Sequence, residues 1–336
     1  MPEVGARRWI VSGSDHGVGE RCTPAVPTGR SPERVLQVLL GALWIADGML
    51  QLQPSMFSRA FVTGQLLPVA QGNPAAVAGP ITAIGRFLEP HIALWNALFA
   101  AIQLAIGVGL LVRRTVRPAL AASFVWSLGV WWFAEGLGGL LTGTASALTG
   151  APGAVLIYAL VGLAAWPRRA RDLDPKTAGG GLIGERGERI VWALLWVGSA
   201  GLILQPANLA GGGLRSALVS AEGGQPRWYA WFLARAADAV GGHGTVLTLA
   251  VAAEMLVVGA GVALGWRGAS LLGVAIVVAT AIWVLPEGLG GILTGRGTDP
   301  NTGPLLALAG LAWHRSRREP ERVEIAAMPA GVAIAA

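Results

Sequence analysis

WWFAEGLGGLLTG (131–143) and IWVLPEGLGGILTG (282–295) are two copies of one sequence element in a single chain. Their glutamates, Glu135 and Glu287, lie 152 residues apart. The same spacing, without a gap, pairs Trp44 with Trp196, Gln53 with Gln205, Pro54 with Pro206, His91 with His243, and Pro152 with Pro304. Because so many matches fall in one register, we infer a tandem duplication and expect two copies of one structural module.

The composition is that of a membrane protein. Hydrophobic residues make up 53% of the chain and charged residues 13%, and the mean hydropathy is +0.57. A soluble domain carries about 25% charged residues, so these apolar side chains are expected to face lipid. The net charge is +6, but the arginines separate apolar runs instead of following one face. We therefore predict no nucleic-acid partner.

Each copy holds four apolar stretches, most of which approach the roughly 20 residues that span a bilayer. They cover about 35–53, 91–112, 117–137 and 151–166 in the first copy, and 189–205, 244–265, 268–286 and 302–314 in the second. We predict an all-α polytopic membrane protein with eight transmembrane helices, arranged as two parallel-repeat four-helix bundles. The segments 55–90 and 207–242 are predicted to form short helices over the outer mouth of each module.

The distribution of basic residues predicts the orientation. If both termini are cytoplasmic, all but six of the 25 basic residues fall on that side; the six are Arg59, Arg86, Arg215, Arg227, Arg235 and Arg296. The predicted location is the cytoplasmic (inner) membrane of a bacterium. The predicted organisation is a cytoplasmic tail (1–33), a membrane module (34–168), a cytoplasmic linker (169–186), a second module (187–316) and a second tail (317–336).

Three matched pairs of polar residues are the main site candidates: Gln53 and Gln205, His91 and His243, and Glu135 and Glu287. All are expected at one depth, near the outer boundary of the bilayer. A carboxylate in the membrane costs about 2.5–3.5 kcal/mol at mid-bilayer, and one at a helix C-terminus also opposes the helix dipole. Either the two glutamates reach the headgroups and mark helix ends, or they form a ligand, ion or proton site.

Three unmatched polar residues are secondary candidates. Asp47 pairs with Ser199 and Glu254 pairs with Ile102, while Gln103 lies beside Ile102. For Gln103 and Glu254, hydrogen bonding between helices is an alternative role. Gly107 and Gly259 are expected at close helix contacts.

Enzyme chemistry has no visible motif in this sequence. A P-loop, an HExxH metal motif, a serine nucleophile elbow and paired cysteines are all missing, and Cys22 is the single cysteine. Two His and two Glu are suitable metal ligands, and two His can hold a haem. Nothing in the sequence fixes their distances, so we predict neither group. We make no positive prediction of enzyme activity.

AIQLAIGVGLLVRRTVRPALAASF (101–124) and AAEMLVVGAGVALGWRGASLLGVAIVV (252–278) resemble the second-to-third helix region of DoxX/DoxD-like membrane proteins. Gln103 and Glu254 match the polar position of that family, and Arg113 and Arg267 match its basic helix end. The resemblance covers about a third of each module. It implies that the protein is a membrane partner of redox enzymes and works near the quinone pool. The doubling of the module and the EGLGG–LTG element depart from the family.

Three hypotheses follow for the function. The leading one is a DoxX-like subunit or accessory protein of a membrane redox system that binds a quinone-like or other amphiphilic ligand near the outer face. The second is a transporter or channel that uses Glu135 and Glu287 as ion or proton sites. The third is a structural membrane scaffold. The sequence does not fix the cofactor, the partner protein or the oligomeric state.

Overall fold

The computed structural model describes residues 32–167, 181–210 and 212–315, and its secondary structure is helical, with no strand in these ranges. This confirms the all-α prediction for that part of the chain. The predicted tails, 1–33 and 317–336, and the predicted linker, 169–186, lie largely outside the described residues. The boundaries of the two modules therefore stay predictions.

The helices repeat with the spacing found in the sequence. α3 (Ala75–Leu88) and α10 (Arg227–Val240) begin and end 152 residues apart, and so do α4 (Ile92–Leu111) and α11 (Gly244–Ala263). The other long helices are α1 (Pro32–Leu50), α5 (Val116–Phe133), α6 (Ala154–Ala164), α7 (Gly184–Ile203), α12 (Ala269–Val284) and α13 (Thr302–Arg315). The short segments include η1 (Pro54–Phe57), α2 (Arg59–Phe61), η2 (Val62–Leu66), η3 (Leu67–Ala70), η4 (Glu89–His91), α8 (Pro206–Ala210), α9 (Leu214–Ala221) and η9 (Gly241–His243).

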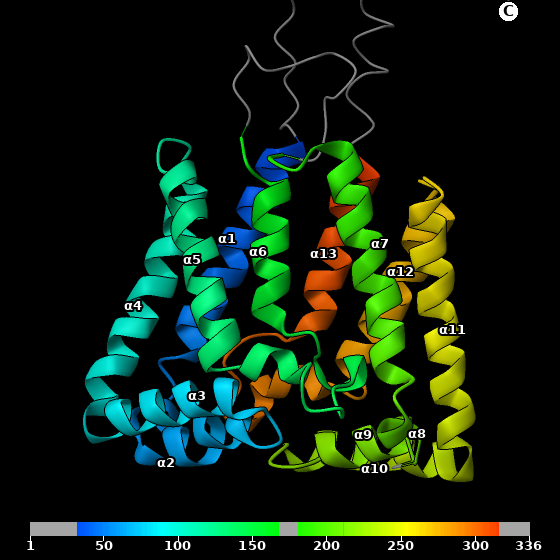
Figure 1. The fold of residues 1–336 in the computed structure, drawn as a ribbon, viewed down its shortest axis with the longest axis horizontal. Coiled ribbons are helices and arrows are strands. Elements are labelled where there is room, and N and C mark those ends of the chain that lie inside the picture. The colour runs from blue at the N-terminus through cyan, green and yellow to red at the C-terminus, as the bar shows by residue number, and fades with distance from the viewer. Residues whose placement is uncertain (1–31, 168–180, 211, 316–336) are drawn as a thin grey trace, which may run out of the picture. The chain divides into compact units, whose positions relative to one another are not determined.

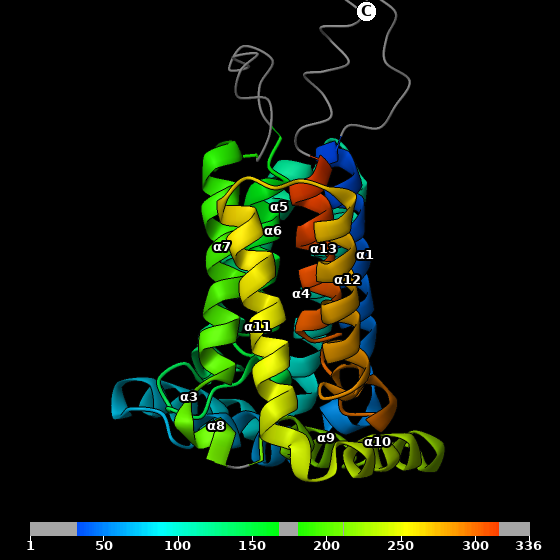
Figure 2. The same cartoon turned by 90° about the vertical axis from the view of Figure 1, so that its right-hand side faces the viewer.

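The long helices run alongside one another, and the short ones lie across one end of them (Figures 1 and 2). α1 packs along α4, and α7 packs along α11 in the same way. α5 contacts α6, α12 contacts α13, and α6 and α13 join the two halves. The short helices α2, α3, α8, α9 and α10 occupy the lower end in Figure 1. The prediction of short helices across one end is therefore correct.

α3 and α10 bury the same face in both halves. The buried positions of α3 are Val77, Ile81, Gly85 and Leu88, and those of α10 are Tyr229, Leu233, Ala237 and Val240. These positions recur every three or four residues, which is the spacing of one helix face. The opposite face of α10 exposes Trp228 and Trp231, as expected of a helix that lies at an interface between apolar and polar surroundings.

Small residues allow the long helices to approach closely. A Cβ atom on Gly107 of α4 would lie 2.6 Å from Cγ1 of Ile45 and 2.8 Å from the carbonyl oxygen of Gly41, both on α1. In the second half a Cβ atom on Gly259 would lie 2.7 Å from Cγ2 of Val197. The predicted close-packing role of Gly107 and Gly259 is confirmed.

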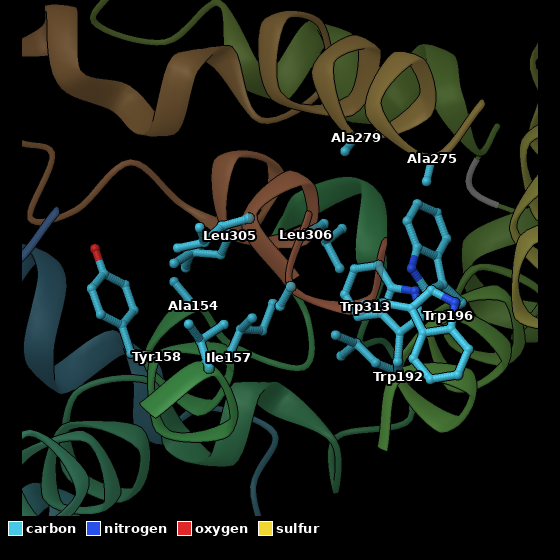
Figure 3. Packing of buried hydrophobic residues seen from close by; sticks show 14 of the residues in the cluster. Ala154, Ile157, Tyr158, Trp192, Trp196, Ala275, Ala279, Leu305, Leu306 and Trp313 are labelled. Atoms are coloured by element: carbon cyan, nitrogen blue, oxygen red, sulfur yellow. The ribbon is translucent and has the colours of Figure 1, made fainter. Parts of the chain in front are cut away.

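One apolar core runs through both halves of the described chain (Figure 3). It includes Ile157 and Tyr158 of α6, Trp192 and Trp196 of α7, Ala275 and Ala279 of α12, and Leu305, Leu306 and Trp313 of α13. Trp44 of α1 packs on the ring of Tyr158, with 4.6 Å between ring centroids. Because α6 and α13 contribute to the same cluster, the halves are held together by buried apolar surface.

Three helical stretches are long and apolar enough to cross a membrane: Ala75–Leu111, Arg227–Ala263 and Ala269–Thr294. This corrects the expectation that eight separate spans would have these properties. α1 and α7 carry charged residues in their first turns, such as Glu33 and Glu185. α6 and α13 have 11 and 14 residues, fewer than the roughly 20 that span a bilayer in full.

Candidate ligand-binding site

The EGLGG elements form a left-handed turn that is the same in both halves. Residues 136 to 138 have φ angles of 55°, 57° and 63°, and residues 288 to 290 have 55°, 57° and 66°. The middle residue is Leu137 or Leu289, and a left-handed leucine costs roughly 1–2 kcal/mol. Glycine on both sides avoids that cost at the neighbouring positions. The turn ends α5 and α12 and directs the chain back toward the next long helix.

Each turn glutamate reaches the beginning of the helix that follows. Oε1 of Glu135 accepts a hydrogen bond from the backbone N–H of Val155, at 3.3 Å, near the start of α6. Oε2 of Glu287 accepts one from the N–H of Gly303, at 3.1 Å, and its Oε1 accepts one from the hydroxyl of Thr302, both at the start of α13. The N-terminal dipole of the following helix therefore compensates each carboxylate, which explains how glutamate is tolerated there.

The two glutamates differ in whether a carboxylate oxygen remains without a hydrogen-bond partner among the described residues. Both carboxylate oxygens of Glu287 have partners, and the residue is 7% exposed. Oε2 of Glu135 is buried and has no hydrogen-bond partner among the described residues. Gly153 packs directly against that oxygen, since a Cβ atom there would lie 2.2 Å from it. Glu287 is thus a helix cap, whereas Glu135 caps a helix and keeps one oxygen for another partner.

Glu135 lines a cavity of about 830 Å³, most of whose wall comes from the first half of the chain. The aromatic part of its wall comprises Trp44, Phe61, Phe87, Trp95, Phe99, Trp126 and Phe133. The polar part comprises Asp47, Gln51, Gln65, Gln103, Glu135, Thr298 and Asp299. Phe87 and Val125 line the cavity and are 63% and 70% exposed, so the cavity opens sideways between α3 and α5.

Several buried polar atoms on the cavity wall have no hydrogen-bond partner among the described residues. They are Oδ1 of Asp47, Oε1 of Gln51, Oε1 of Gln103, Nε1 of Trp126 and Oε2 of Glu135. Buried polar groups in proteins are nearly always paired, and each unpaired one costs about 1–3 kcal/mol. Other unpaired buried polar atoms are spread over both halves, but these five belong to residues that line one cavity, where a bound molecule can reach them.

The second half carries apolar residues where the first half carries these polar ones. The positions that correspond to Gln51, Gln103 and Trp126 are Ile203, Met255 and Val278. All three are buried in the apolar core. The equivalent part of the second half is therefore packed core, and the two halves are not two copies of one site.

A loop of the second half closes the cavity of the first. Nε2 of Gln53 donates a hydrogen bond to the carbonyl of Gly297 at 3.1 Å, and the hydroxyl of Ser55 donates one to the carbonyl of Gly295. The equivalent loop of the first half is held in the same way, because Nδ2 of Asn208 donates to the carbonyl of Ala145 at 2.9 Å. Each half therefore contributes a loop to the other.

Asp299 is the residue that this loop brings to the cavity. Its Oδ1 accepts a hydrogen bond from the N–H of Asn301 at 2.7 Å, and its Oδ2 accepts one from the hydroxyl of Thr298 at 2.8 Å. Burial raises the pKa of the Asp299 carboxyl above its usual value. Asp299 was not among the predicted site residues, because its equivalent in the first half is Ala147. Its signal in the sequence is an acidic residue that follows the second GLGG and has no acidic counterpart after the first.

A second, more polar cavity of about 530 Å³ adjoins the first. Its wall includes both glycine-rich turns, through Gly138, Gly139, Gly290 and Gly291, together with Thr142, Thr144, Ser146, Arg296 and Asn301. Glu135 and Asp299 line both cavities. The two acids therefore stand between an aromatic space inside the first half and a polar space at the end of the molecule where the turns lie.

The predicted site residues divide into three groups. Glu135, Asp47 and Gln103 line the aromatic cavity. Gln53 anchors the closing loop, and Glu287 caps α13. The others line neither cavity: Gln205 lies near the start of α8, and His91, His243 and Glu254 are exposed.

The histidines do not join the glutamates. His91 and His243 do lie at the same end of the long helices as the glycine-rich turns, as predicted, since they precede α4 and α11. Among the described residues no group of three or more His, Cys, Asp and Glu side chains is placed to hold a metal ion. The arrangement of the site is thus that of an aromatic pocket with a carboxyl-rich end.

Comparison of the chain with protein-family models, with curated proteins and with solved structures finds no match. The class of protein must therefore be defined from its own fold and cavity. Its described residues form an all-helical fold with three helical stretches that are long and apolar enough to cross a membrane and a pocket built by both halves of a duplicated chain.

Proposed function

We propose that the chain is an integral membrane protein with eight membrane-spanning helices, whose first half binds an amphiphilic ligand in the aromatic cavity. The proposed membrane helices are α1, α4, α5, α6, α7, α11, α12 and α13. Of these, α6 and α13 have 11 and 14 residues, so the helical part of each would cross only part of the bilayer. The outward faces of the longer helices support the proposal, since Val125, Val257 and Val277 are 70%, 58% and 67% exposed. Soluble proteins rarely expose extended apolar surfaces, whereas lipid favours them.

The basic residues support one orientation. Arg113, Arg114 and Arg117 lie in or beside the α4–α5 connection, and Arg267 lies in the α11–α12 connection. Both connections are at the end opposite the glycine-rich turns (Figures 1 and 2). Because cytoplasmic loops are enriched in Lys and Arg, we assign that end to the cytoplasm and the turns to the outer face of a bacterial inner membrane.

The observation that carries the ligand proposal is the cavity with its unpaired buried polar atoms. Its volume lies within the roughly 300–1,000 Å³ of small-molecule sites. An apolar wall with a few polar groups at one end suits a molecule with a tail and a head group. The sideways opening at Phe87 and Val125 would face lipid in the proposed orientation, so the ligand can enter from the bilayer.

The resemblance to DoxX/DoxD-like proteins extends the proposal to a partner. It implies that the protein works beside a membrane redox enzyme, with a quinone-like molecule as the ligand. The cavity itself requires only an amphiphile whose head group can satisfy Asp47, Gln103 and Glu135.

A transport function is the second candidate, and one observation favours it. The aromatic cavity and the polar cavity meet at Glu135 and Asp299. A solute or a proton that passes from one to the other would pass these carboxyls. Glu287 has no comparable place, since both of its oxygens are engaged at the start of α13.

The test of ligand binding is the retention of small molecules by protein extracted with its surrounding lipid in polymer-bounded discs. We expect mass spectrometry to detect an amphiphile enriched with the wild-type protein and reduced at least about tenfold in Gly129→Phe. Gly129 lines the cavity, and a Cβ atom there would meet no heavy atom within 4 Å. A side chain can therefore begin at this position without a clash at its Cβ atom, and a phenylalanine ring would take up part of the cavity.

Gly273→Phe is the matched control. Gly273 is also on a long helix with open space at its Cβ position, but it lines neither cavity. It should retain the amphiphile at the wild-type level. Equal retention by both variants would reject the cavity as the binding site. If nothing is retained and Glu135→Gln abolishes proton- or ion-dependent uptake into proteoliposomes, transport replaces ligand binding; without either activity, a scaffold role remains.

A further inference from the structure

We infer that the ligand of the aromatic cavity carries a cationic head group, such as a quaternary or protonated amine. This inference rests on the proposed function and names the chemical class of its ligand. It favours a positively charged amphiphile over the neutral quinone that the family resemblance implies.

The charge of the cavity wall has one sign. Asp47, Glu135 and Asp299 supply three carboxyl groups, and none of the described residues that line this cavity is Lys, Arg or His. The wall of the neighbouring polar cavity includes one basic residue, Arg296, and that residue is exposed. Carboxyl groups that share a low-dielectric space disfavour one another's ionisation, and a bound cation removes that penalty.

A cluster of acids would not suffice, but the acids here have unused acceptors. Asp47 is 2% exposed, and its carboxyl interacts with the hydroxyl of Tyr158, but its Oδ1 has no hydrogen-bond partner in the described chain. Oε2 of Glu135 and Oε1 of Gln103 are in the same state. These are acceptor atoms, so the missing partner is a donor or a cation.

The aromatic residues fit the same head group. Trp44 lies one helical turn before Asp47 on α1, and Trp95 and Trp126 complete the wall on α4 and α5. Aromatic faces attract ammonium groups, most strongly when water is excluded. A cationic head near Asp47 would therefore meet carboxylates and indole rings together, while its tail extends along the apolar wall.

The head group is expected at the outer end of the cavity. Asp47 is in the last turn of α1, Glu135 directly follows α5, and Asp299 is in the loop before α13. All three positions are at the end where the glycine-rich turns lie. Ala122, by contrast, lies in the middle of α5, farther from that end. An amphiphile bound in this direction keeps its head near the outer membrane surface, as it would in the bilayer.

The experiment compares three probes with the same tail and different head charge. Radiolabelled dodecyltrimethylammonium, dodecanol and dodecanoate are equilibrated with the protein in nanodiscs of an uncharged glycolipid that has no ammonium group, and binding to empty discs is subtracted. We expect the cation to bind at least about tenfold more tightly than the alcohol, and the carboxylate to bind most weakly, since a charge-assisted contact contributes more than 1.4 kcal/mol. Gly129→Phe should abolish saturable binding of every probe.

Variants taken from the other half of the chain test the residues. Asp47→Ser and Asp299→Ala introduce the equivalent residues, Ser199 and Ala147. Each substitution should lower the affinity for the ammonium probe by about tenfold and change the affinity for dodecanol by less than about twofold. If Asp299→Ala does not fold, Asp299→Asn replaces it, because asparagine keeps an acceptor for the N–H of Asn301. Asp299→Asn should lower the affinity for the ammonium probe by the same factor. Glu254→Ile, a change to the equivalent of Ile102 at an exposed acid, should alter neither probe.

The outcomes separate the two proposals. If dodecanol or a decyl quinone binds as tightly as the ammonium probe, and Gly129→Phe removes that binding, the cavity is a ligand site and the cationic head group is rejected. Equal loss of dodecanol and cation in Asp47→Ser also rejects it. If no probe binds saturably to the wild-type protein, the proposed ligand-binding function fails as well.

Discussion

Replacing Gly138 with alanine should prevent the protein from reaching its folded state, whereas the same change at Gly139 should cost about 1–2 kcal/mol. Both glycines have positive φ angles, 63° and 69°, so both substitutions introduce left-handed alanine. They differ in space. A Cβ atom at Gly138 would lie 1.9 Å from the carbonyl oxygen of Pro152, whereas at Gly139 the nearest atom is 3.8 Å away.

The contact at Gly138 is with backbone, so no side-chain rotation relieves it. The chain before α6 would have to move away, and Glu135 would lose its position at the start of that helix. The measurement is the yield of monodisperse detergent-solubilised protein and its thermal unfolding midpoint. Gly290 and Gly291 repeat the comparison, with nearest distances of 2.6 Å and 3.7 Å. Similar behaviour of Gly138→Ala and Gly139→Ala would show that the close approach is not needed.

Replacing Glu287 with alanine should lower the free energy of unfolding by about 2–4 kcal/mol, because two buried donors then lose their acceptor. The donors are the hydroxyl of Thr302 and the N–H of Gly303. The same change at Glu135 should cost about 1 kcal/mol, since it removes one longer hydrogen bond, to Val155.

The comparison separates a structural glutamate from one that serves a ligand. Unfolding in a graded denaturant series, in one detergent, measures both variants against the wild type. Glu135→Ala should also reduce retention of the amphiphile, while folded Glu287→Ala should retain it. A larger loss of stability at Glu135 than at Glu287 would contradict the assignment of roles.

The residues that are identical in the two copies predicted the fold better than the site. The repeat of EGLGG correctly indicated a duplicated helical chain. The cost of a glutamate at a helix end raised the question of what compensates it, but the start of the following helix was not among the predicted partners. Only the left-handed turn brings that helix start near the glutamate. His91 and His243 are matched as well, yet both are exposed.

The cavity arises where the copies differ. In the second copy, Ser199 and Met255 correspond to Asp47 and Gln103. In the first copy, Ala147 corresponds to Asp299. Residues that are identical in the two copies form the turn and cap the following helix in both halves. Residues that differ form a packed apolar core in the second half and line the cavity in the first. Identity between the two copies therefore favours the wrong residues: Asp47, Gln103 and Asp299 have no matching polar residue, and the loop of Asp299 reaches the cavity from the other half.

All of the functional proposals require that the glycine-rich turns and the arginine-bearing connections face opposite sides of a membrane. Because Cys22 is the single cysteine, Cys22→Ser gives a background for placing one thiol at a time. Thr144 and Arg114 are exposed, the first beside the polar cavity and the second in the α4–α5 connection. A membrane-impermeant thiol reagent applied to intact spheroplasts should label Thr144→Cys at once and Arg114→Cys only after permeabilisation. Labelling of both from the same side would contradict the account.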